Sequence, residues 1–195
     1  MKIRHLTWIA ALLLAAVPAR SQDESPGGPE ALNPEMAAAG LGDRVLAFCM
    51  RNLGVKVGNG QCATLASQAL QSAGAIRTAR DFPNAGDYVW GRQVALIEAG
   101  RKRVAGLESL ALVMPGDIIQ FRNARLQGAG AGGFGTYWMT ADHHTAVVGA
   151  VDAGNAVVTV YHQNWGRKIV RLDRMLMADL KKGWLRFYRP QKRGE

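Results

Sequence analysis

The chain has 195 residues and a formal net charge of +9 at pH 7. Its length and composition fit one modest domain with a single core. A basic chain can bind nucleic acid, but the charges are dispersed apart from the cluster Arg101, Lys102 and Arg103 and the C-terminal tail, and no recognition motif accompanies them. We therefore expect no nucleic-acid partner.

The N-terminal segment has the pattern of a secretory signal peptide. A basic start precedes an apolar core over residues 6–17, and small side chains follow at Ala19 and Ser21. We expect cleavage before Gln22 and a secreted or periplasmic mature protein. The apolar core is short for a membrane span and no second segment is long enough, so we expect no stable membrane insertion after cleavage.

The whole chain divides into four parts. We expect the signal peptide at 1–21, a linker at 22–40, a catalytic domain at 41–190 and a basic tail at 191–195. Cleavage lowers the basic count from 24 to 21 and leaves the acidic count at 15, so the mature chain carries about +6. This charge favours association with anionic polymers of a cell envelope.

Helices are expected near residues 34–38 and 43–53. The second stretch is amphipathic, with Val45 and Cys49 on its apolar face. Cys49 is therefore expected to be a small buried apolar group. The alternative in an exported protein is a disulfide with Cys62, although an apolar helix face and a turn-to-helix junction are poorly matched in geometry.

Cys62 is the most informative residue of the chain. It lies where the polar turn 58–61 meets a helix-forming run at 62–73, with Gly74 as the expected C-cap. Unpaired N–H groups and the dipole at a helix N-terminus stabilise a thiolate, which is the form of cysteine that attacks carbonyl carbon. We expect Cys62 to be a nucleophile, and the alternative is a buried, inert thiol.

Downstream of this helix, the pattern changes from helix to strand. A further helix is expected near 91–99, and a short one over 172–182, with Asp173 as its N-cap and Gly183 at its end. Strands are expected near residues 117–122, 144–151, 156–161, 168–172 and 184–188. Helices first and strands afterwards predict an α+β fold with an antiparallel sheet.

Two of these strands carry polar residues that can serve Cys62. A nucleophilic cysteine needs a base and a third group that orients the base. His143 and His144 face opposite sides of a strand, so only one can face Cys62. On the next strand, His162 and Asn164 are two residues apart and share a face, so either can reach His144.

These motifs resemble those of a CHAP-type (cysteine, histidine-dependent amidohydrolase/peptidase) domain, close to the NlpC-type cell-wall peptidases of the papain-like superfamily. The resemblance covers residues 43–190. The segments that carry it are Gly60-Gln61-Cys62, Pro115-Gly116-Asp117-Ile118-Ile119-Gln120-Phe121, His144-Thr145-Ala146-Val147-Val148 and Gln163-Asn164-Trp165.

The resemblance implies a papain-like α+β fold, in which N-terminal helices pack on a C-terminal antiparallel sheet. It implies Cys62 as nucleophile, His144 as general base and later acid, and Asn164 as a polar partner of the imidazole. CHAP domains commonly have glutamate where this chain has His162, whereas NlpC-type enzymes often use histidine as the third member. Whether His162 or Asn164 orients His144 stays open at this point.

Three tryptophans are candidates for substrate binding. Trp90 follows the nucleophile helix, Trp138 follows a glycine-rich stretch at 128–135 that is expected to be a mobile loop, and Trp165 comes directly after Asn164. Core packing is the alternative for Trp90 and Trp165.

The expected function is that of an exported, monomeric cysteine-dependent amidohydrolase or peptidase, which cleaves an amide bond in peptidoglycan through a Cys-His pair. No cofactor is expected, and no metal, because the local spacings of zinc motifs are missing. Asp117 is expected to shape a turn rather than to act in catalysis. The alternatives are an inactive binding module of the envelope, since His162 replaces an expected acid, and a thiol hydrolase that acts on another amide.

Overall fold

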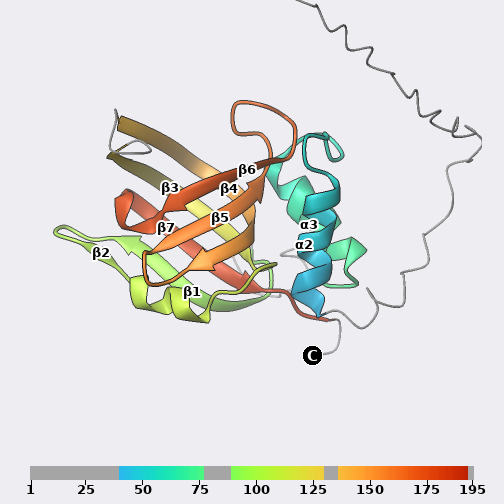
Figure 1. The fold of residues 1–195 in the computed structure, drawn as a ribbon, viewed down its shortest axis with the longest axis horizontal. Coiled ribbons are helices and arrows are strands. Elements are labelled where there is room, and N and C mark those ends of the chain that lie inside the picture. Colours follow the sequence, from blue (N-terminus) through green and yellow to red (C-terminus); the bar gives the residue numbers. More distant parts are fainter. Residues whose placement is uncertain (1–39, 77–88, 130–135, 193–195) are drawn as a thin grey trace, which may run out of the picture.

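The computed structural model describes residues 40–76, 89–129 and 136–192 (Figure 1). The predicted signal peptide, almost all of the predicted linker, the helix expected at 34–38 and the last three residues of the tail lie outside this part of the chain. No helix in the described part is long and apolar enough to span a membrane.

Seven antiparallel strands form one sheet in the described residues. The strand order across the sheet is β2-β1-β7-β3-β4-β5-β6. The strands are β1 (Arg92–Ala99), β2 (Val104–Ala105), β3 (Ile118–Ala129), β4 (Thr136–Asp152), β5 (Val157–His162), β6 (Arg171–Leu176) and β7 (Leu180–Arg189). Two short 3-10 helices, η2 (Leu107–Leu112) and η4 (Met177–Asp179), lie between strands.

Two α-helices, α2 (Leu41–Arg51) and α3 (Cys62–Ser72), precede the sheet in the described chain and pack at one side of it (Figure 1). Both agree with the helices expected at 43–53 and 62–73. The helix α3 ends as expected, because Gly74 adopts a positive φ of 76° just beyond it, a conformation that glycine accepts without steric cost.

The sheet has a hydrophobic core on each face, because successive strand residues point to opposite sides. Ile118 of β3 and Val147 of β4 belong to the cluster that includes the buried residues of α2 and α3. Their neighbours Ile119 and Val148 belong to a second cluster, formed mainly by the other face of the strands. The helices are therefore fixed to one face by apolar burial.

The predicted α+β class is wrong for this chain, because the described residues form mainly antiparallel β-sheet. The segment 91–99, expected to be helical, is β1. Its side chains alternate, with Ala95 and Ile97 buried, and its backbone pairs with β7. Pairing with β7 decides the structure of this segment against the helical propensity of its alanine, leucine and glutamate residues.

A second correction concerns residues 168–182. The strand expected at 168–172 begins later, at Arg171, and the helix expected over 172–182 is replaced by β6, η4 and the start of β7. Asp173 is therefore not an N-cap: it lies in β6, directly opposite Val160 of β5. The partner strand β5 determines this geometry, and local capping signals cannot reveal it.

The strands β3 and β4 are longer than predicted. They extend the hairpin to Ala129 and Thr136, so part of the predicted glycine-rich loop is β-strand, and residues 130–135 lie outside the described chain.

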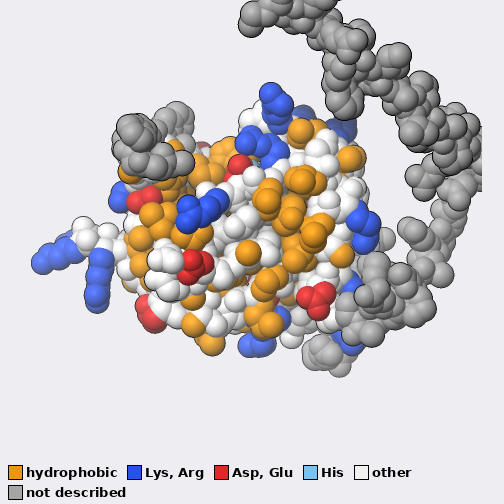
Figure 2. All heavy atoms as spheres, in the orientation of Figure 1, with side chains coloured by type: hydrophobic (Ala, Val, Ile, Leu, Met, Phe, Trp, Pro, Cys, Tyr) orange, Lys and Arg blue, Asp and Glu red, His pale blue; other side chains and the backbone are white. Residues whose placement is uncertain are grey.

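Basic side chains are dispersed over the face of the molecule drawn in Figure 2 and do not form a single patch. Arg101, Lys102 and Arg103 are exposed between β1 and β2, far along the sheet from the helices (Figure 1).

Candidate active site

Cys62 is the first residue of α3, and the turn before it is held by side-chain hydrogen bonds. The carboxamide oxygen of Asn59 accepts from the backbone N–H of Gln61 at 3.0 Å and from the hydroxyl of Thr64 at 2.7 Å. Gln61 has the extended backbone of an N-cap residue. The thiol is thus placed beside the first N–H groups of the helix, which have no partners within the helix.

Gln163 fixes this turn to the sheet. Its side chain is completely buried. Its Oε1 accepts from the N–H of Val57 at 3.1 Å, and its Nε2 donates to the carbonyls of Val57 at 3.0 Å and Gln61 at 2.7 Å. Because Gln163 follows β5, these bonds tie the residue that precedes α3 to the end of a strand 102 residues away in sequence.

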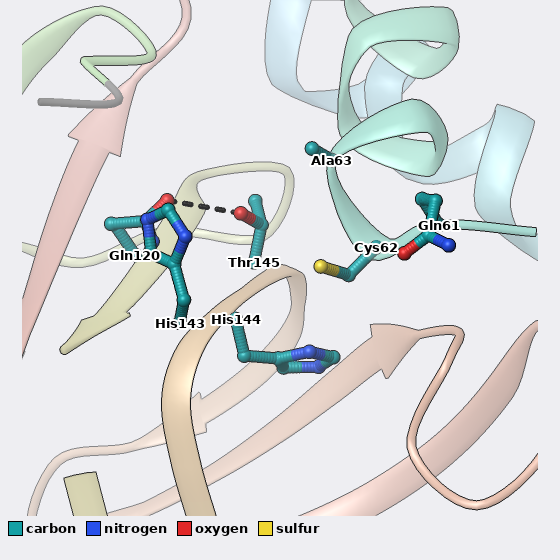
Figure 3. Close-up of a pocket in the computed structure, with 7 residues that line it drawn as sticks. All are labelled: Gln61, Cys62, Ala63, Gln120, His143, His144 and Thr145. Carbon is teal, nitrogen blue, oxygen red and sulfur yellow. Dashed lines mark hydrogen bonds between the residues drawn. The ribbon is translucent and has the colours of Figure 1, made fainter. Parts of the chain in front are cut away.

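Cys62 and His144 line the same pocket, which has a volume of about 290 Å³. Its lining residues are Gln61, Cys62, Ala63, Gln120, His143, His144 and Thr145. Figure 3 shows the sulfur of Cys62 pointing into the pocket from the first turn of α3, with His144 on the strand side. Helix and strand thus supply opposite walls.

His144 makes its hydrogen bond through one ring nitrogen, Nε2, which lies 3.2 Å from Nδ1 of His162. The other nitrogen of His162, Nε2, lies 2.7 Å from Oδ2 of Asp173. His144 is 6% exposed and His162 is fully buried. The two histidines and the carboxylate therefore form a chain of hydrogen bonds that runs from the pocket wall through β4 and β5 to β6.

Aromatic rings enclose the two histidines. The ring of Trp165 lies 4.7 Å from the His144 ring and 5.2 Å from the His162 ring, measured between centroids, and Phe121 lies 5.6 Å from His144. Burial and, secondarily, the nearby charge of His162 lower the pKa of His144 to about 3. The pKa of His162 is also lowered by burial, although Asp173 opposes this effect. His144 is therefore neutral at pH 7, because burial disfavours its protonated form.

Asn164 lies apart from the imidazole chain. It is exposed, has a positive φ of 64°, and donates from Nδ2 to Oε1 of Gln61 at 2.7 Å. Of the two residues left open by the sequence, His162 is the one whose ring is hydrogen-bonded to His144, whereas Asn164 contacts the N-cap residue of α3. His143 also lines the pocket but is exposed.

The three tryptophans have different surroundings. Trp90 is 3% exposed and donates from Nε1 to Oε1 of Gln120 at 3.0 Å. The hydroxyl of Thr145 donates to the same oxygen at 2.9 Å (Figure 3), so Trp90 supports the pocket wall from behind. Trp165 is half-buried against the histidines, and the side chain of Trp138 lies outside the described part of the structure.

The two cysteines differ in accessibility, and both are free. Cys49 is fully buried in α2, and this burial raises the pKa of its thiol to about 12. The alternative of a disulfide between Cys49 and Cys62 is therefore wrong. Among the described residues, no group of three or more His, Cys, Asp or Glu side chains is placed to hold a metal ion.

Sequence reasoning missed three residues of this site. The sequence predicts Asp173 as a helix cap, and it places Gln163 and Gln120 in motif segments without a role of their own. The register between β5 and β6 is what reveals Asp173. Because it lies opposite Val160, it is the diagonal neighbour of His162 on the same face of the sheet.

A cysteine on the first turn of a helix, across a pocket from a histidine on a strand, is the arrangement of proteins with a cysteine proteinase fold. The sequence matches the AIM3/BBC1 cysteine proteinase-fold domain over residues 20–194, and the chain belongs to this family. The predicted resemblance is therefore confirmed at the level of a papain-like cysteine proteinase fold. The finer assignment to CHAP or NlpC types stays a prediction.

Two crystal structures of Ly7917 are similar to this chain. One has 19% sequence identity and a TM-score of 0.42. The other, with the hydrolyzing product of MDP, has 20% identity and a TM-score of 0.44. Each match covers 76% of this chain and 62% of the other, so this chain spans less than two thirds of the length of Ly7917. No curated protein matches the sequence.

Proposed function

We propose that this protein is a cysteine-dependent hydrolase of amide bonds, with Cys62 as the nucleophile and His144 as its base. The observation that carries this proposal is the shared pocket of Cys62 and His144, in which Nε2 of His144 is already engaged by His162. Nδ1 is then the imidazole nitrogen left for the thiol. Membership of a cysteine proteinase-fold family supports the same chemistry.

In the first half of the reaction, Nδ1 of His144 takes the proton of the Cys62 thiol, and the thiolate attacks the carbonyl carbon of the substrate. The tetrahedral oxyanion accepts hydrogen bonds from the first N–H groups of α3, where the helix dipole adds favourable positive charge. The proton on Nδ1 then passes to the leaving amine as the C–N bond breaks. The products of this step are a free amine and a thioester on Cys62.

In the second half, a water molecule gives one proton to Nδ1 of His144 while its oxygen attacks the thioester carbonyl. The C–S bond breaks, the proton on Nδ1 returns to the sulfur, and the product leaves as a carboxylic acid. The step needs no reactant other than water. A neutral His144 is required at the start of each half, and its lowered pKa keeps it neutral.

The polar wall opposite the nucleophile offers contacts to the substrate backbone. Gln120 and Thr145 are almost fully buried yet line the pocket. Hydrogen bonds from Trp90 and Thr145 fix the carboxamide oxygen of Gln120, and its Nε2 donates to the carbonyl of Phe121 at 3.2 Å, which fixes the direction of the NH₂ group. In this proposal, the second hydrogen of that NH₂ group is donated to an acceptor of the substrate close to the scissile amide.

The substrate class belongs to the same proposal, and it is supported by charge and by the motifs that resemble CHAP and NlpC domains. An exported protein with a net positive charge associates with anionic wall polymers. We propose peptidoglycan as the substrate and the secreted or periplasmic space as the place of action.

The test is digestion of purified sacculi by the full chain, with mass spectrometry of the soluble fragments. New fragments with free amine and carboxyl ends are expected from wild type and from Cys49→Ala, and none from Cys62→Ala or His144→Ala. Sedimentation of wild type with the sacculi without new fragments would contradict the hydrolase and favour a binding module. Hydrolysis of synthetic peptide amides but not of sacculi would retain the chemistry and reject the substrate.

A further inference from the structure

Asp173 is the end of the hydrogen-bond chain that starts at His144. Its Oδ2 lies 2.7 Å from Nε2 of the buried His162, and its side chain is 29% exposed. Its other oxygen, Oδ1, lies 3.4 Å from Nη2 of Arg171, which is the residue opposite His162 on β6. No hydrogen bond links Asp173 directly to Cys62 or His144 among the contacts of the described residues, so any effect on them passes through His162.

The carboxylate determines which nitrogen of each ring carries the proton. An ionised carboxylate accepts hydrogen bonds and cannot donate them, so Nε2 of His162 must be protonated. In the neutral ring Nδ1 of His162 is then an acceptor, and Nε2 of His144 must be the donor across the 3.2 Å contact. This leaves Nδ1 of His144 unprotonated, which is the form that can remove a proton from Cys62.

We propose that Asp173 is a positioning residue that acts through His162 to hold His144 in its catalytically competent tautomer. The inference rests on the proposed function of Cys62 and His144. When Nδ1 of His144 takes the thiol proton, both of its nitrogens carry hydrogen and the bond to His162 keeps its direction. No proton has to leave the hydrogen-bond chain of His144, His162 and Asp173. The negative Asp173 offsets the positive charge on His144 through the polarised ring of His162.

This arrangement gives a role to the histidine that replaces the expected acid. A neutral His162 alone can donate from either nitrogen, so it would accept both tautomers of His144 equally well. With Asp173 accepting from Nε2 of His162, the bond between the two rings has only one possible direction, from Nε2 of His144 to Nδ1 of His162. The carboxylate that orients the base is thus present in the site, but one residue further from the nucleophile.

The first test reads the tautomers without any turnover. Imidazole ¹⁵N NMR of a Cys62→Ala background should show His144 and His162 protonated at Nε2 alone. Adding Asp173→Ala, or Asp173→Asn, whose NH₂ can donate to Nε2 of His162, should place hydrogen on Nδ1 of His144 in a measurable fraction of molecules. Asp173→Glu should restore the original pattern. Unchanged tautomers in both the Ala and Asn variants would overturn the proposal.

The second test is kinetic and uses the active chain. Asp173→Asn should lower kcat by at least about tenfold with little change in KM, because orientation of the base contributes to proton transfer more than to substrate binding. Asp173→Glu should recover part of this loss. Glu98→Gln, which changes an exposed carboxylate on β1, is the control and should keep wild-type kcat. Equal kcat in wild type and Asp173→Asn would reject the positioning role.

The two tests separate the two proposals. If Cys62→Ala hydrolyses substrate as fast as wild type, the proposed function fails, whatever the NMR spectra show. If Cys62→Ala is inactive but the tautomers do not depend on Asp173, the hydrolase stands and only the role of Asp173 fails. A melting temperature for each variant shows whether it is folded, and the NMR result from Asp173→Glu gives a second folded comparison.

Discussion

The side chain of Gln163 forms hydrogen bonds with the backbone of Val57 in both directions, as acceptor from its N–H and as donor to its carbonyl. A third bond reaches the carbonyl of Gln61, immediately before Cys62. The position of Cys62 thus depends on one buried amide from the strand side of the site.

Replacement of Gln163 by alanine should therefore destabilise the protein. Val57 is also buried, so its N–H would lose its partner away from water, whereas its carbonyl keeps the hydrogen bond from the N–H of Gly60 at 3.0 Å. Such a loss costs about 1–3 kcal/mol per buried group, and we expect the free energy of unfolding in urea to fall by about 1–3 kcal/mol. Gln93→Ala, at an exposed position of β1, should change it by less than about 0.5 kcal/mol. Equal effects of the two substitutions would show that the hydrogen bonds of Gln163 do not stabilise the fold.

The two thiols should differ sharply in reactivity. Iodoacetamide at pH 8 should modify Cys62 in the folded protein, and Cys49 only after unfolding, because burial raises the pKa of Cys49 to about 12 and removes it from solvent. Peptide mass spectrometry after short labelling times measures both sites. His144→Ala should slow the labelling of Cys62 and leave Cys49 protected. Modification of Cys49 at the rate of Cys62 would show that α2 opens readily.

The two buried histidines predict a loss of stability in mild acid. The pKa of His144 is lowered to about 3 and that of His162 is lowered as well, in both cases mainly by burial, whereas an unfolded histidine titrates near about 6.5. The unfolded chain therefore binds these protons first. The stability contributed by neutral His144 is complete above about pH 6.5 and is lost as the pH falls toward about 3. The lowered pKa of His162 makes stability depend on pH in the same direction.

Urea unfolding between pH 7 and pH 5 tests this linkage, since most carboxylates stay ionised in that range. The free energy of unfolding should fall with pH by up to about 1.4 kcal/mol per unit for each histidine. His144→Gln should show a shallower slope than wild type. A slope that is the same in wild type, His144→Gln and His162→Gln would mean that the rings are not held neutral by the fold.

Local sequence patterns predicted the part of the site that is local. Cys62 at the start of a helix follows from a polar turn before an apolar repeat, and both features lie within a few residues of it. The two α-helices were predicted for the same reason. The helix predicted for residues 91–99 is wrong because the composition of this segment favours a helix in isolation. In the folded protein, pairing with β7 stabilises the strand more than helical propensity stabilises a helix.

The hydrogen-bond chain beyond His144 could not be predicted, because it depends on the pairing of distant strands. His162 and Asn164 share a face in an ideal strand, and that rule left both open as partners. The strand β5 ends at His162, and Asn164 then adopts a positive φ that turns its side chain to Gln61. To predict the contact of Asp173 with His162, one needs the register of β6 against β5. No local signal in the sequence specifies that register.

Asp117 and Arg189 form an ion pair with a buried carboxylate, and its disruption gives the last prediction. Nε of Arg189 donates to Oδ1 of Asp117 at 2.7 Å, and Nη2 donates to Oδ2 at 3.0 Å. Asp117 is 1% exposed and also accepts from the N–H of Met114, which confirms the predicted role of Asp117 in a turn. The carboxylate in turn raises the pKa of the Arg189 guanidinium.

Arg189→Met should lower the free energy of unfolding by about 3–5 kcal/mol, because it leaves the Asp117 charge buried without its partner. Asp117→Asn combined with Arg189→Met should recover much of this loss, since no unpaired charge remains. Arg92→Met, at an exposed residue that pairs with Arg189 across β1 and β7, is the matched control and should cost less than about 0.5 kcal/mol. Urea unfolding of the four proteins forms the comparison. A loss below about 1 kcal/mol for Arg189→Met would place this pair with weak surface ion pairs and would leave the turn to be held by its backbone bonds alone.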